Sequence, residues 1–367
     1  MKTVAVDARM WRHPGIGRYL RELSTRLVSQ KARYFFHFLG DEALTAELPR
    51  VPGAPWGFTA ARAPIYGAAE QFEIPAKSAG FDLLHVPHFN APLFFPKKLA
   101  VTVHDLIYLR NAGASRFGLG ALYARRLLNH IQKKASIIFT VSEHTKNDLL
   151  NYFPRLDPGR IGVTPEAAGP LFRKIGDGDS LNKIRADYSL DRPFILCVGS
   201  LKKHKNIPAL IQAMADLRER KKIDHELALV GRPDPKNPGL LRLIRRSGFV
   251  RYLGEVPDES LAGIYNLADL FVMPSFFEGF GLPVLEAMAC GVPVLVSNRA
   301  SLPEVGGEAA LTFDPGRIDA LGELLYNVLQ DKGLRLKMIE MGFARAKEFS
   351  WERTARQTLE GYCRVLG

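Results

Sequence analysis

Short apolar segments alternate with amphipathic segments along the first half of the chain. Runs of apolar, β-branched and aromatic residues predict strands at 2–7, 33–39, 82–86, 99–103 and 137–141. Apolar residues at helical spacing predict a helix that starts near Ile16 and further helices at 117–134 and 143–151. Strands that alternate with helices are typical of βαβ units, which build a parallel sheet.

The same alternation restarts after the segment 164–182, whose proline, glycine and aspartate content is typical of a linker. A helical pattern covers 206–222. Apolar runs around it predict strands at 194–198, 227–230, 250–253, 270–273, 293–297 and 310–313. The pattern therefore predicts an α/β fold of two doubly wound, Rossmann-like domains that face each other across a cleft. Ligands of such domains bind at the carboxyl ends of the strands.

The length of 367 residues agrees with two domains of roughly 150 residues each. The predicted divisions are an N-terminal domain, a linker, a C-terminal domain and a final helix, at 1–165, 166–182, 183–345 and 346–367. The net charge is +12, and residues 1–180 hold 24 basic and 15 acidic side chains, an excess of nine. A basic first half predicts an anionic partner, which is nucleic acid, a membrane surface or a phosphorylated substrate.

Cysteine usage and apolar run lengths favour a cytoplasmic protein. The three cysteines are far apart and lack metal-ligand spacing. No apolar run approaches the ~20 residues of a membrane-spanning helix, and the first residues lack the apolar core of a signal peptide. Asp177 and Asp179 have the Asp-x-Asp spacing of some metal–nucleotide sites, but they fall in the linker and are interpreted as a solvated turn. We expect neither a metal nor a cofactor.

The segment 274–297, PSFFEGFGLPVLEAMACGVPVLVS, carries the most specific pattern. A predicted strand ends near its start and a helix begins near Pro283, which places Glu278 in a loop and Glu286 in the helix. Amide groups at a helix N-terminus bind anions and hydroxyls. Two carboxylates so placed accept hydrogen bonds from hydroxyls on either side of a bound diphosphate. The other candidate binding residues of the segment are Gly279, Phe280, Gly281 and Leu282.

A second segment, FILCVGSLKKHKN at 194–206, ends a predicted strand and continues into a cationic loop. Lys202, Lys203 and Lys205 stand at the carboxyl end of that strand, beside the start of the next helix. Cations in this position suit a diphosphate, and a solvated lysine run is the alternative interpretation. The candidate binding residues here are Gly199, Ser200 and Lys205.

Loops of the first half add weaker candidates. His104 follows the strand 99–103, where an imidazole can donate to a sugar hydroxyl or share a proton. Gly15 and Gly17 precede a helix and allow a ligand to approach closely, although this spacing alone is a weak signal and also fits a plain turn. The segment HVPHFNAP at 85–92 supplies candidate acceptor-pocket residues, His85, His88 and Asn90.

Taken together, these segments resemble glycosyltransferase family four, the retaining, nucleotide-sugar-dependent enzymes of the two-domain GT-B type. The resemblance runs from end to end. It is carried by Glu278-x7-Glu286 with its GFGLPVLEAMACGVPV continuation, by SLPEVGGEAALTFDP at 301–315, by VGSLKKHKN at 198–206 and by WERTA at 351–355. It implies an acceptor-side domain in the first half, a donor domain in the second, and a last helix, containing Trp351, that returns to the first domain.

The resemblance also implies roles for the matching residues. Lys205 contacts the donor diphosphate and stabilises the leaving group, while Glu278 and the backbone of 279–282 hold the hexose. Glu286 holds the ribose, and His104 approaches the donor hexose. The glycine-bearing loop before the first helix meets phosphate or acceptor.

Two positions depart from the family pattern. Ser200 and His204 stand where many members have arginines, so this chain offers the diphosphate less fixed charge. The nucleotide base is expected against the backbone around 250–252, which makes Tyr252 a candidate. Because backbone contacts are poorly legible in a sequence, both GDP and UDP remain open.

The activity implied by the resemblance is transfer of a hexose from a nucleoside diphosphate sugar to an acceptor hydroxyl, with retention and without a metal. It would serve polysaccharide, lipopolysaccharide or glycolipid assembly. The segment 301–315 looks most like mannosyl- and rhamnosyl-type members, so GDP-mannose is the first expectation. A UDP-glucose-type donor and an epimerase or hydrolase of the same fold are alternatives. A nucleic-acid-binding protein is a remote one, and nucleic acid is not expected as a partner.

The basic first half predicts docking on an anionic membrane surface, at the inner face of the membrane, to reach a saccharide or lipid-linked acceptor. As a helix, the segment 116–134 places apolar residues near one side, Leu119, Leu122, Tyr123, Leu127 and Ile131. Cations occupy or flank the other side, Arg125, Arg126, Lys133 and Lys134. The alternative is that the apolar side packs on the sheet, as in most amphipathic helices.

Overall fold

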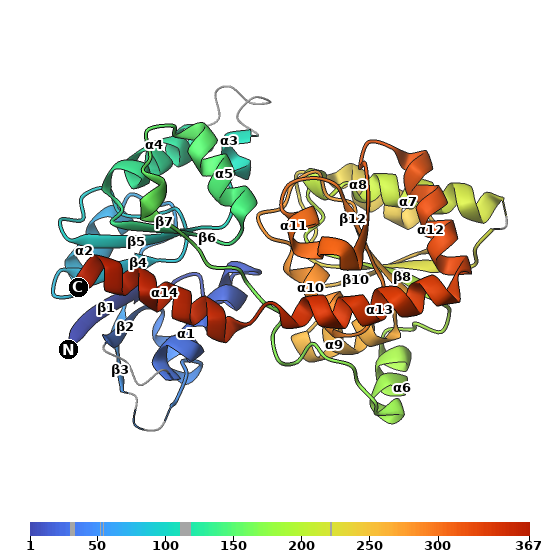
Figure 1. The fold of residues 1–367 in the computed structure, drawn as a ribbon, viewed down its shortest axis with the longest axis horizontal. Coiled ribbons are helices and arrows are strands. Elements are labelled where there is room, and N and C mark those ends of the chain that lie inside the picture. The colour runs from blue at the N-terminus through green and yellow to red at the C-terminus, as the bar shows by residue number, and fades with distance from the viewer. Residues whose placement is uncertain (30–33, 52, 54, 111–118, 221) are drawn as a thin grey trace. The chain divides into compact units, whose positions relative to one another are not determined.

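The computed structural model describes residues 1–29, 34–51, 53, 55–110, 119–220 and 222–367. They form two compact units (Figure 1). Unit 1 comprises Met1–Glu166 and Ser350–Gly367, and unit 2 comprises Ala167–Phe349. The first boundary lies one residue beyond the predicted end of the N-terminal domain, and the last helix belongs to unit 1.

Within its described residues, unit 1 holds a parallel seven-stranded sheet in the order β3-β2-β1-β4-β5-β6-β7. The strands are β1 (Lys2–Asp7), β2 (Tyr34–Gly40), β3 (Trp56–Ala60), β4 (Leu83–Val86), β5 (Lys98–Val103), β6 (Ile137–Thr140) and β7 (Ile161–Val163). The helices are α1 (Ile16–Ser29), α2 (Glu70–Ser78), α3 (Ile107–Arg110), α4 (Leu119–Lys134), α5 (Glu143–Tyr152) and α14 (Trp351–Leu366). In register, Val6 of β1 pairs with Phe38 of β2 and with His85 of β4.

Unit 2 repeats this plan with a parallel six-stranded sheet, again counted over its described residues, in the order β10-β9-β8-β11-β12-β13. The strands are β8 (Phe194–Val198), β9 (Glu226–Val230), β10 (Val250–Gly254), β11 (Leu270–Met273), β12 (Val294–Ser297) and β13 (Ala310–Phe313). The helices are α6 (Gly178–Asp187), α7 (Ile207–Glu219), α8 (Pro238–Arg246), α9 (Asp258–Leu267), α10 (Leu282–Ala289), α11 (Leu302–Gly306), α12 (Ile318–Gln330) and α13 (Lys332–Lys347). Two doubly wound α/β units are therefore present, as predicted.

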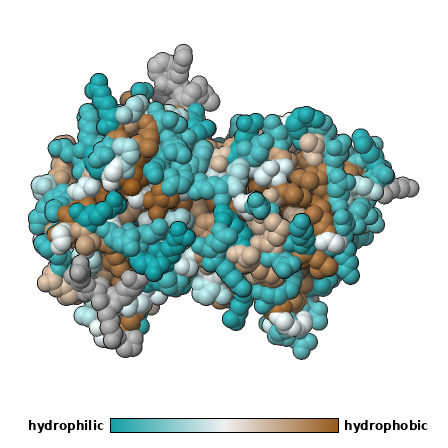
Figure 2. Space-filling model, in the orientation of Figure 1, coloured by the Kyte–Doolittle hydropathy of each residue, from teal (hydrophilic) through white to brown (hydrophobic). Residues whose placement is uncertain are grey.

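The central strands of both sheets are buried on both faces. Consecutive residues along β4 and β6 are buried, and so are those of β11 and β12. A parallel sheet covered by helices on both sides requires this, and it explains why these strands are continuous apolar runs in the sequence. The surface drawn in Figure 2 is mostly hydrophilic, with apolar patches on each unit.

The last helix, α14, completes unit 1. The Ser350 hydroxyl accepts from the Arg353 amide at 3.2 Å, which caps the start of the helix. Trp351 is buried, with its ring 6.0 Å from that of Tyr19 on α1. Further along, the Tyr362 hydroxyl lies 2.6 Å from Nδ1 of His85 in the middle of the sheet. A helix far away in sequence thus contributes to the core of the first unit.

Four elements of unit 1, β3, β7, α2 and α3, are absent from the sequence prediction. β3 is only partly buried along its length, β7 and α3 span three and four residues, and α2 contains Pro75, so each has a weak pattern. The predicted linker was too long, because α6 begins inside it. Asp177 caps this helix by accepting from the Asp179 amide at 3.1 Å, so the Asp-x-Asp spacing marks an exposed helix start rather than a turn.

The amphipathic helix α4 begins at Leu119, and the predicted residues 116–118, with the side chain of Leu119, lie outside the described residues. Its apolar side packs on the sheet: Leu127 and Ile131 are at most 1% exposed and belong to the unit 1 core. In the described part of the chain, every helix is too short or too polar to cross a bilayer.

Candidate active site

The strand order of unit 2 reverses between β8 and β11. β9 lies on the far side of β8, and β12 lies on the far side of β11. The loops that leave these two neighbouring strands therefore diverge, and doubly wound sheets bind their ligands at this switch point. The loop after β8 carries the cationic segment, and the loop after β11 carries the first glutamate of the 274–297 segment.

These two loops bring Lys205 and Glu278 together. The Lys205 Nζ donates to Oε1 of Glu278 at 2.6 Å and to Oε2 at 2.9 Å. The two side chains are 16% and 12% exposed, so the pair is shielded but still reachable from solvent. A second link joins the loops, because the Phe276 amide donates to the His204 carbonyl at 2.8 Å. The arrangement provides one cation and one carboxylate at a single point.

Glycines allow the backbone to pass close to this pair. Gly199 has φ +148°, and a Cβ there would lie 3.4 Å from Nζ of Lys205. Gly231, which follows β9, has φ +139°, and a Cβ there would lie 2.1 Å from the Gly199 carbonyl oxygen. A side chain at either position would therefore strain the backbone or push the loop away. Ser200, the next residue after Gly199, remains partly exposed.

Ser301 supports the glutamate loop, and sequence reasoning did not select it. Its buried hydroxyl lies 3.0 Å from the Glu278 carbonyl and 2.7 Å from the Phe280 carbonyl, so it can donate to either. The neighbouring Leu302 packs against Gly281, where a Cβ would lie 2.7 Å from its Cδ2. Ser301 is the first residue of the family motif at 301–315, and this is the signal in the sequence that could have indicated a role for it.

The start of α10 lies directly after the loop. Gly281, at φ +106°, is the N-cap residue, and it offers no capping side chain. The Phe280 ring is buried 5.8 Å from the Phe349 ring, so this residue presents its backbone rather than its side chain. Gly279 precedes Phe280 in the loop, and Leu282 is the first residue of α10. The loop therefore offers main-chain groups beside the Glu278 carboxylate.

Glu286 occupies a different environment. It has no exposed surface, and its Oε2 accepts from the Tyr265 hydroxyl at 3.0 Å. A direct contact with a ribose, as the resemblance implies, requires the covering side chains to move. Tyr252 donates its hydroxyl to the Gly231 carbonyl at 2.8 Å, and with Pro233, Leu241 and other residues it lines a cavity of about 420 Å³.

His204 supplies no charge to the switch point near neutral pH. Burial lowers its pKa to about 4, and the neighbouring Lys205 adds to the shift. Lys202 and Lys203 are exposed on the loop. Lys205 is therefore the cation that a defined partner, Glu278, holds at the switch point. A neutral His204 is consistent with the expectation that this chain offers a diphosphate less fixed charge than family members with arginines.

Among the described residues, no three His, Cys, Asp or Glu side chains are grouped so as to hold a metal ion. Burial raises the pKa of Cys197, at the end of β8, to about 12, which keeps this cysteine a neutral thiol.

In unit 1, His104 lies just after β5 with both ring nitrogens directed at protein groups. Nε2 lies 3.0 Å from the Pro87 carbonyl, and Nδ1 lies 3.3 Å from Oε1 of Glu166. Its ring also packs edge-on against Tyr19 at 4.8 Å. The carboxylate of Asp105 accepts from the Ile107 amide at 2.9 Å, which makes it the cap of the short helix α3.

The three predicted acceptor residues fall into two classes. His85 is 1% exposed, and its two nitrogens hydrogen bond to Tyr362 at 2.6 Å and to Thr102 at 2.9 Å. In contrast to the prediction, no nitrogen of His85 is left for an acceptor, because the strand turns this side chain into the core. His88 and Asn90 follow β4 at the carboxyl edge of the sheet, where ligands of such sheets bind. Both side chains are nevertheless buried, and Asn90 donates to Glu70 at 3.1 Å.

Gly15 and Gly17 differ from each other as well. Gly15 is exposed at φ +80°, and a Cβ added there would meet no atom within 4 Å, so its conformation alone favours glycine. At Gly17 a Cβ would lie 2.2 Å from the Trp11 carbonyl oxygen. Close packing of α1 on the preceding loop explains Gly17 without any ligand.

Two family profiles match the chain, one to each half. The description "Glycosyltransferase Family 4" matches residues 14–167, and "Glycosyl transferases group 1" matches residues 182–345. The chain therefore belongs to the glycosyltransferase family that these two profiles describe. The matched ranges lie almost wholly in unit 1 and unit 2, respectively.

Curated relatives of the chain include two proteins of Escherichia coli. "O-antigen chain mannosyltransferase B" is 37% identical over 65% of this chain and 64% of its own length. "Serotype-specific mannosyltransferase WbdA" is 31% identical over 74% of this chain and 34% of its own length. The chain therefore matches less than two thirds of each of these relatives.

Solved structures share the fold of this chain. The sucrose-phosphate synthase of Thermosynechococcus elongatus superimposes with a TM-score of 0.79 at 21% identity, over 100% of this chain and 99% of that one. This likeness and the two parallel sheets confirm the predicted α/β fold of two doubly wound, Rossmann-like domains.

Proposed function

We propose that this glycosyltransferase moves mannose from GDP-mannose to a hydroxyl of a growing polysaccharide, lipopolysaccharide or glycolipid, with retention of configuration. The pairing of Lys205 with Glu278 at the switch point of unit 2 carries the proposal, because it offers a cation for a diphosphate and a carboxylate for sugar hydroxyls. The names of the two Escherichia coli relatives, both mannosyltransferases, support mannose as the sugar.

In this mechanism the bond between the anomeric carbon and the diphosphate oxygen breaks while the acceptor oxygen bonds to the same carbon. The acceptor proton passes to the leaving phosphate, so the atoms balance without a protein nucleophile. Lys205 stabilises the charge that develops on the diphosphate, and such preorganised electrostatic contacts are often the largest catalytic contribution. With His204 neutral, this task rests mainly on Lys205 and the backbone of the loops.

Donor binding then replaces the Lys205–Glu278 ion pair with one set of contacts to the diphosphate and another to the hexose. Lys205 turns its hydrogen bonds from Glu278 to the diphosphate, and Glu278 accepts from hexose hydroxyls instead. Because the two side chains neutralise each other beforehand, neither is left as an isolated, shielded charge. In this proposal the base lies against β10 near Tyr252, and no metal is required.

The test compares nucleotide sugars with the purified chain. GDP-mannose is expected to raise the melting temperature more than UDP-glucose does, since a ligand that binds the folded state stabilises it. With GDP-mannose and a mannoside acceptor we expect GDP release, an acceptor-dependent disaccharide with an α-linkage, and full activity in EDTA. Loss of activity in EDTA with rescue by Mn²⁺ would contradict the metal-free scheme.

Other products would point to the alternatives. A larger rise in melting temperature with UDP-glucose than with GDP-mannose, together with glucose transfer, would assign UDP-glucose as the donor. Nucleotide release or sugar conversion that is independent of any acceptor would identify a hydrolase or an epimerase and overturn the proposal.

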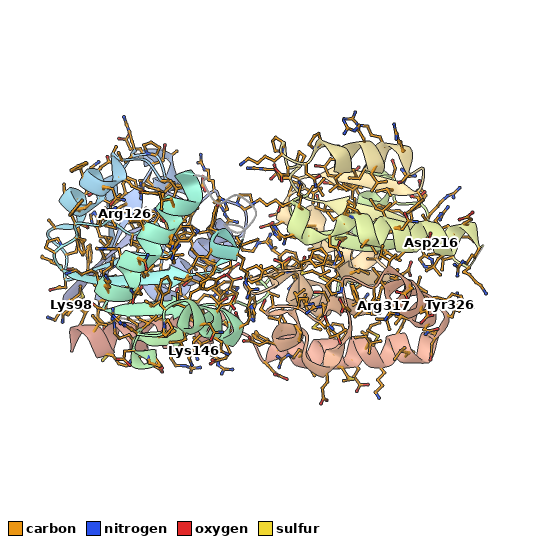
Figure 3. The ribbon with its side chains drawn as sticks, turned by 90° about the horizontal axis from the view of Figure 1, so that it is seen from above. Lys98, Arg126, Lys146, Asp216, Arg317 and Tyr326 are labelled. Atoms are coloured by element: carbon orange, nitrogen blue, oxygen red, sulfur yellow. The ribbon has the colours of Figure 1, made fainter. Side chains whose placement is uncertain are left out.

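The acceptor end is proposed to lie at an anionic membrane surface. The cations Arg125, Arg126, Lys133 and Lys134 are exposed on α4, and Arg126 is labelled on this helix in Figure 3. The apolar residues Leu127 and Ile131 are committed to the core, so attachment relies on charge, with exposed Leu122 as a minor apolar contribution. Each cation near an anionic leaflet contributes about 1 kcal/mol, which gives reversible, salt-sensitive binding.

A further inference from the structure

Two tyrosines stand exposed at the carboxyl edge of the unit 1 sheet. Tyr66, in the loop between β3 and α2, is 39% exposed, and Tyr108, on α3 after β5, is 43% exposed. Both pack against the buried ring of Phe89, at centroid distances of 5.8 and 5.4 Å. Phe89 follows β4, so the three aromatic rings gather where neighbouring parallel strands end, the usual place for a ligand.

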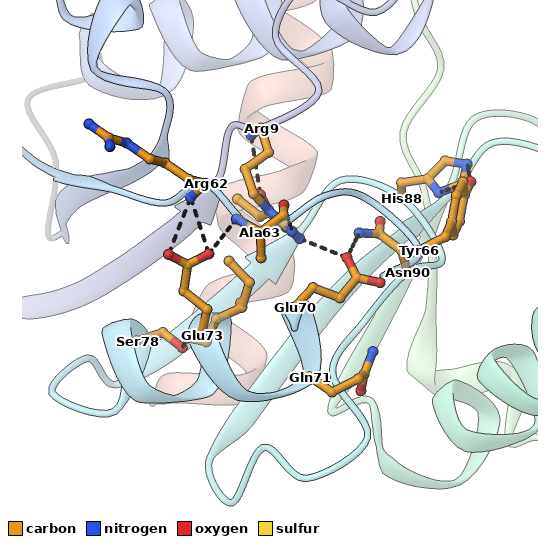
Figure 4. Close-up of polar contacts among 12 residues, drawn as sticks. Arg9, Arg62, Ala63, Tyr66, Glu70, Gln71, Glu73, Ser78, His88 and Asn90 are labelled. Atoms are coloured by element: carbon orange, nitrogen blue, oxygen red, sulfur yellow. Dashed lines mark hydrogen bonds and ion pairs between the residues drawn. The ribbon is translucent and has the colours of Figure 1, made fainter. Parts of the chain in front are cut away.

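Tyr66 is held in this place at a conformational cost. Its φ of +63° lies in the left-handed region, which a bulky residue rarely adopts and which is often associated with functional sites. Its hydroxyl lies 3.3 Å from Nδ1 of the buried His88 (Figure 4). Burial and the nearby Tyr108 raise the pKa of Tyr66, so this phenol keeps its proton at neutral pH.

A network of buried charges lies beside these rings (Figure 4). The Arg9 guanidinium donates to Oδ2 of Asp7 at 2.6 Å and to Oε2 of Glu70 at 3.1 Å. Asn90 donates to the same Glu70 oxygen at 3.1 Å. Side-chain exposure is 5% for Arg9, 3% for Asp7 and 1% for Glu70. Two carboxylates therefore neutralise the cation of this cluster, which leaves it unsuited to hold a phosphate.

We propose that Tyr66 and Tyr108 form a platform on which the terminal sugar of the acceptor stacks, and that this sugar is an uncharged pyranose. The proposal rests on the proposed glycosyl transfer and names the acceptor class for it. A pyranose presents a face of C–H groups with partial positive charge, which fits the negative face of an aromatic ring. The Tyr66 hydroxyl, held beside the buried His88, supplies a polar group at the edge of the platform for a sugar hydroxyl.

The test uses Tyr66→Ala, Tyr108→Ala and Tyr108→Phe, with Tyr152→Ala as the matched control. Tyr152 is 43% exposed, like Tyr108, but lies on α5. The acceptors are methyl α-D-mannopyranoside, α-1,3-mannobiose and mannose 6-phosphate, each with GDP-mannose. We expect the acceptor KM to rise about tenfold in each alanine variant, with a smaller change in kcat and in the donor KM.

The conservative variant and the charged acceptor sharpen the result. Tyr108→Phe keeps the ring and should retain the wild-type KM, and mannose 6-phosphate should be a poorer acceptor than the neutral sugars. An unchanged acceptor KM in both alanine variants, or a preference for the phosphorylated sugar, would overturn the proposal. An equal effect of Tyr152→Ala would do the same.

Saturation-transfer NMR gives a readout that does not need turnover. Saturation of aromatic protons should reach the ring C–H protons of methyl α-D-mannopyranoside in the wild type and in Tyr108→Phe, and should be lost in both alanine variants. Saturation transfer to the sugar without any glycosyl transfer would support the platform while contradicting the proposed function. Glycosyl transfer with an unchanged acceptor KM, and with no saturation transfer from aromatic protons in the wild type or any variant, would reject the platform alone.

Discussion

The Lys205 ammonium lies 2.6 Å from a carboxylate oxygen of Glu278, a residue 73 positions later in the chain. Each side chain comes from a separate sequence motif, and the reversal of strand order between β8 and β11 brings their loops together. A lysine on its own would bind any anion, and a glutamate on its own would repel one. Together they match a ligand that carries a diphosphate and a polyhydroxylated sugar on the same molecule.

Removal of either member of this pair should abolish most transfer. Lys205→Ala and Glu278→Ala are each expected to lower kcat by ~10²–10³, the usual effect of deleting one preorganised electrostatic contact. Steady-state kinetics with GDP-mannose, alongside circular dichroism, measures this. Lys337→Ala, which removes an exposed lysine on α13, serves as the control and should leave the rate unchanged. Near-normal turnover in either folded site variant would refute the assignment.

Ser301→Ala should weaken donor binding without unfolding unit 2. The substitution removes the hydroxyl beside the Glu278 and Phe280 carbonyls, and a buried group left unsatisfied costs about 1–3 kcal/mol. We expect the donor KM to rise roughly tenfold while the acceptor KM changes little.

The matched control for this prediction is Ser78→Ala. Ser78 is also a fully buried serine that donates to a backbone carbonyl, that of Ile74, but it lies in unit 1. If both alanine variants changed the donor KM equally, the effect of Ser301 would be a general loss of stability rather than support of the glutamate loop.

Reversal of charge on α4 should reduce membrane attachment. The double substitution Arg125→Glu with Arg126→Glu is expected to lower binding to anionic vesicles by at least about tenfold, because each cation contributes ~1 kcal/mol. Cosedimentation with phosphatidylglycerol-containing and with neutral phosphatidylcholine vesicles measures this at low salt. The control reverses two exposed arginines of unit 2, Arg245→Glu with Arg246→Glu. Absence of wild-type binding to anionic vesicles would favour a soluble acceptor.

Acidification should destabilise unit 1 through His85. Burial lowers the pKa of this histidine from 6.5 to about 3, so between these values the unfolded chain binds the proton that the folded chain refuses. Stability therefore falls as the pH falls below about 6.5, and His85 contributes a loss of ~2 kcal/mol between pH 7.5 and pH 5. Urea unfolding at the two pH values measures the difference.

A variant that cannot titrate isolates this contribution. His85→Gln should be less stable at pH 7.5, because it disturbs the bonds to Tyr362 and Thr102, yet should lose less stability on acidification. His13→Gln, at an exposed histidine, should keep the wild-type pH slope. An unchanged slope in His85→Gln would show that other groups account for the acid sensitivity.

The fold class and the local settings of the strongest motifs follow from the amino-acid pattern without any tertiary information. Apolar runs that alternate with helical patterns fixed most strands to within a residue or two, because burial on both faces demands continuous apolar residues. Glu278 was placed in a loop between a strand and a helix by its neighbours alone, since glycine and proline act locally on the backbone. Partly buried elements such as β3 and α2 were not predicted, because partial burial requires only a weak pattern of apolar residues.

Which side chains come into contact depends on the tertiary structure. His85 and His88 look equivalent in the sequence, but the former lies inside β4 and bonds to Tyr362 of α14, 277 residues away, while the latter lies past the strand end. The same holds for Ser301 beneath the glutamate loop and for Tyr66 beside Tyr108. Burial and hydrogen-bond partners arise from contacts between distant segments, and no local pattern of residue types encodes those contacts.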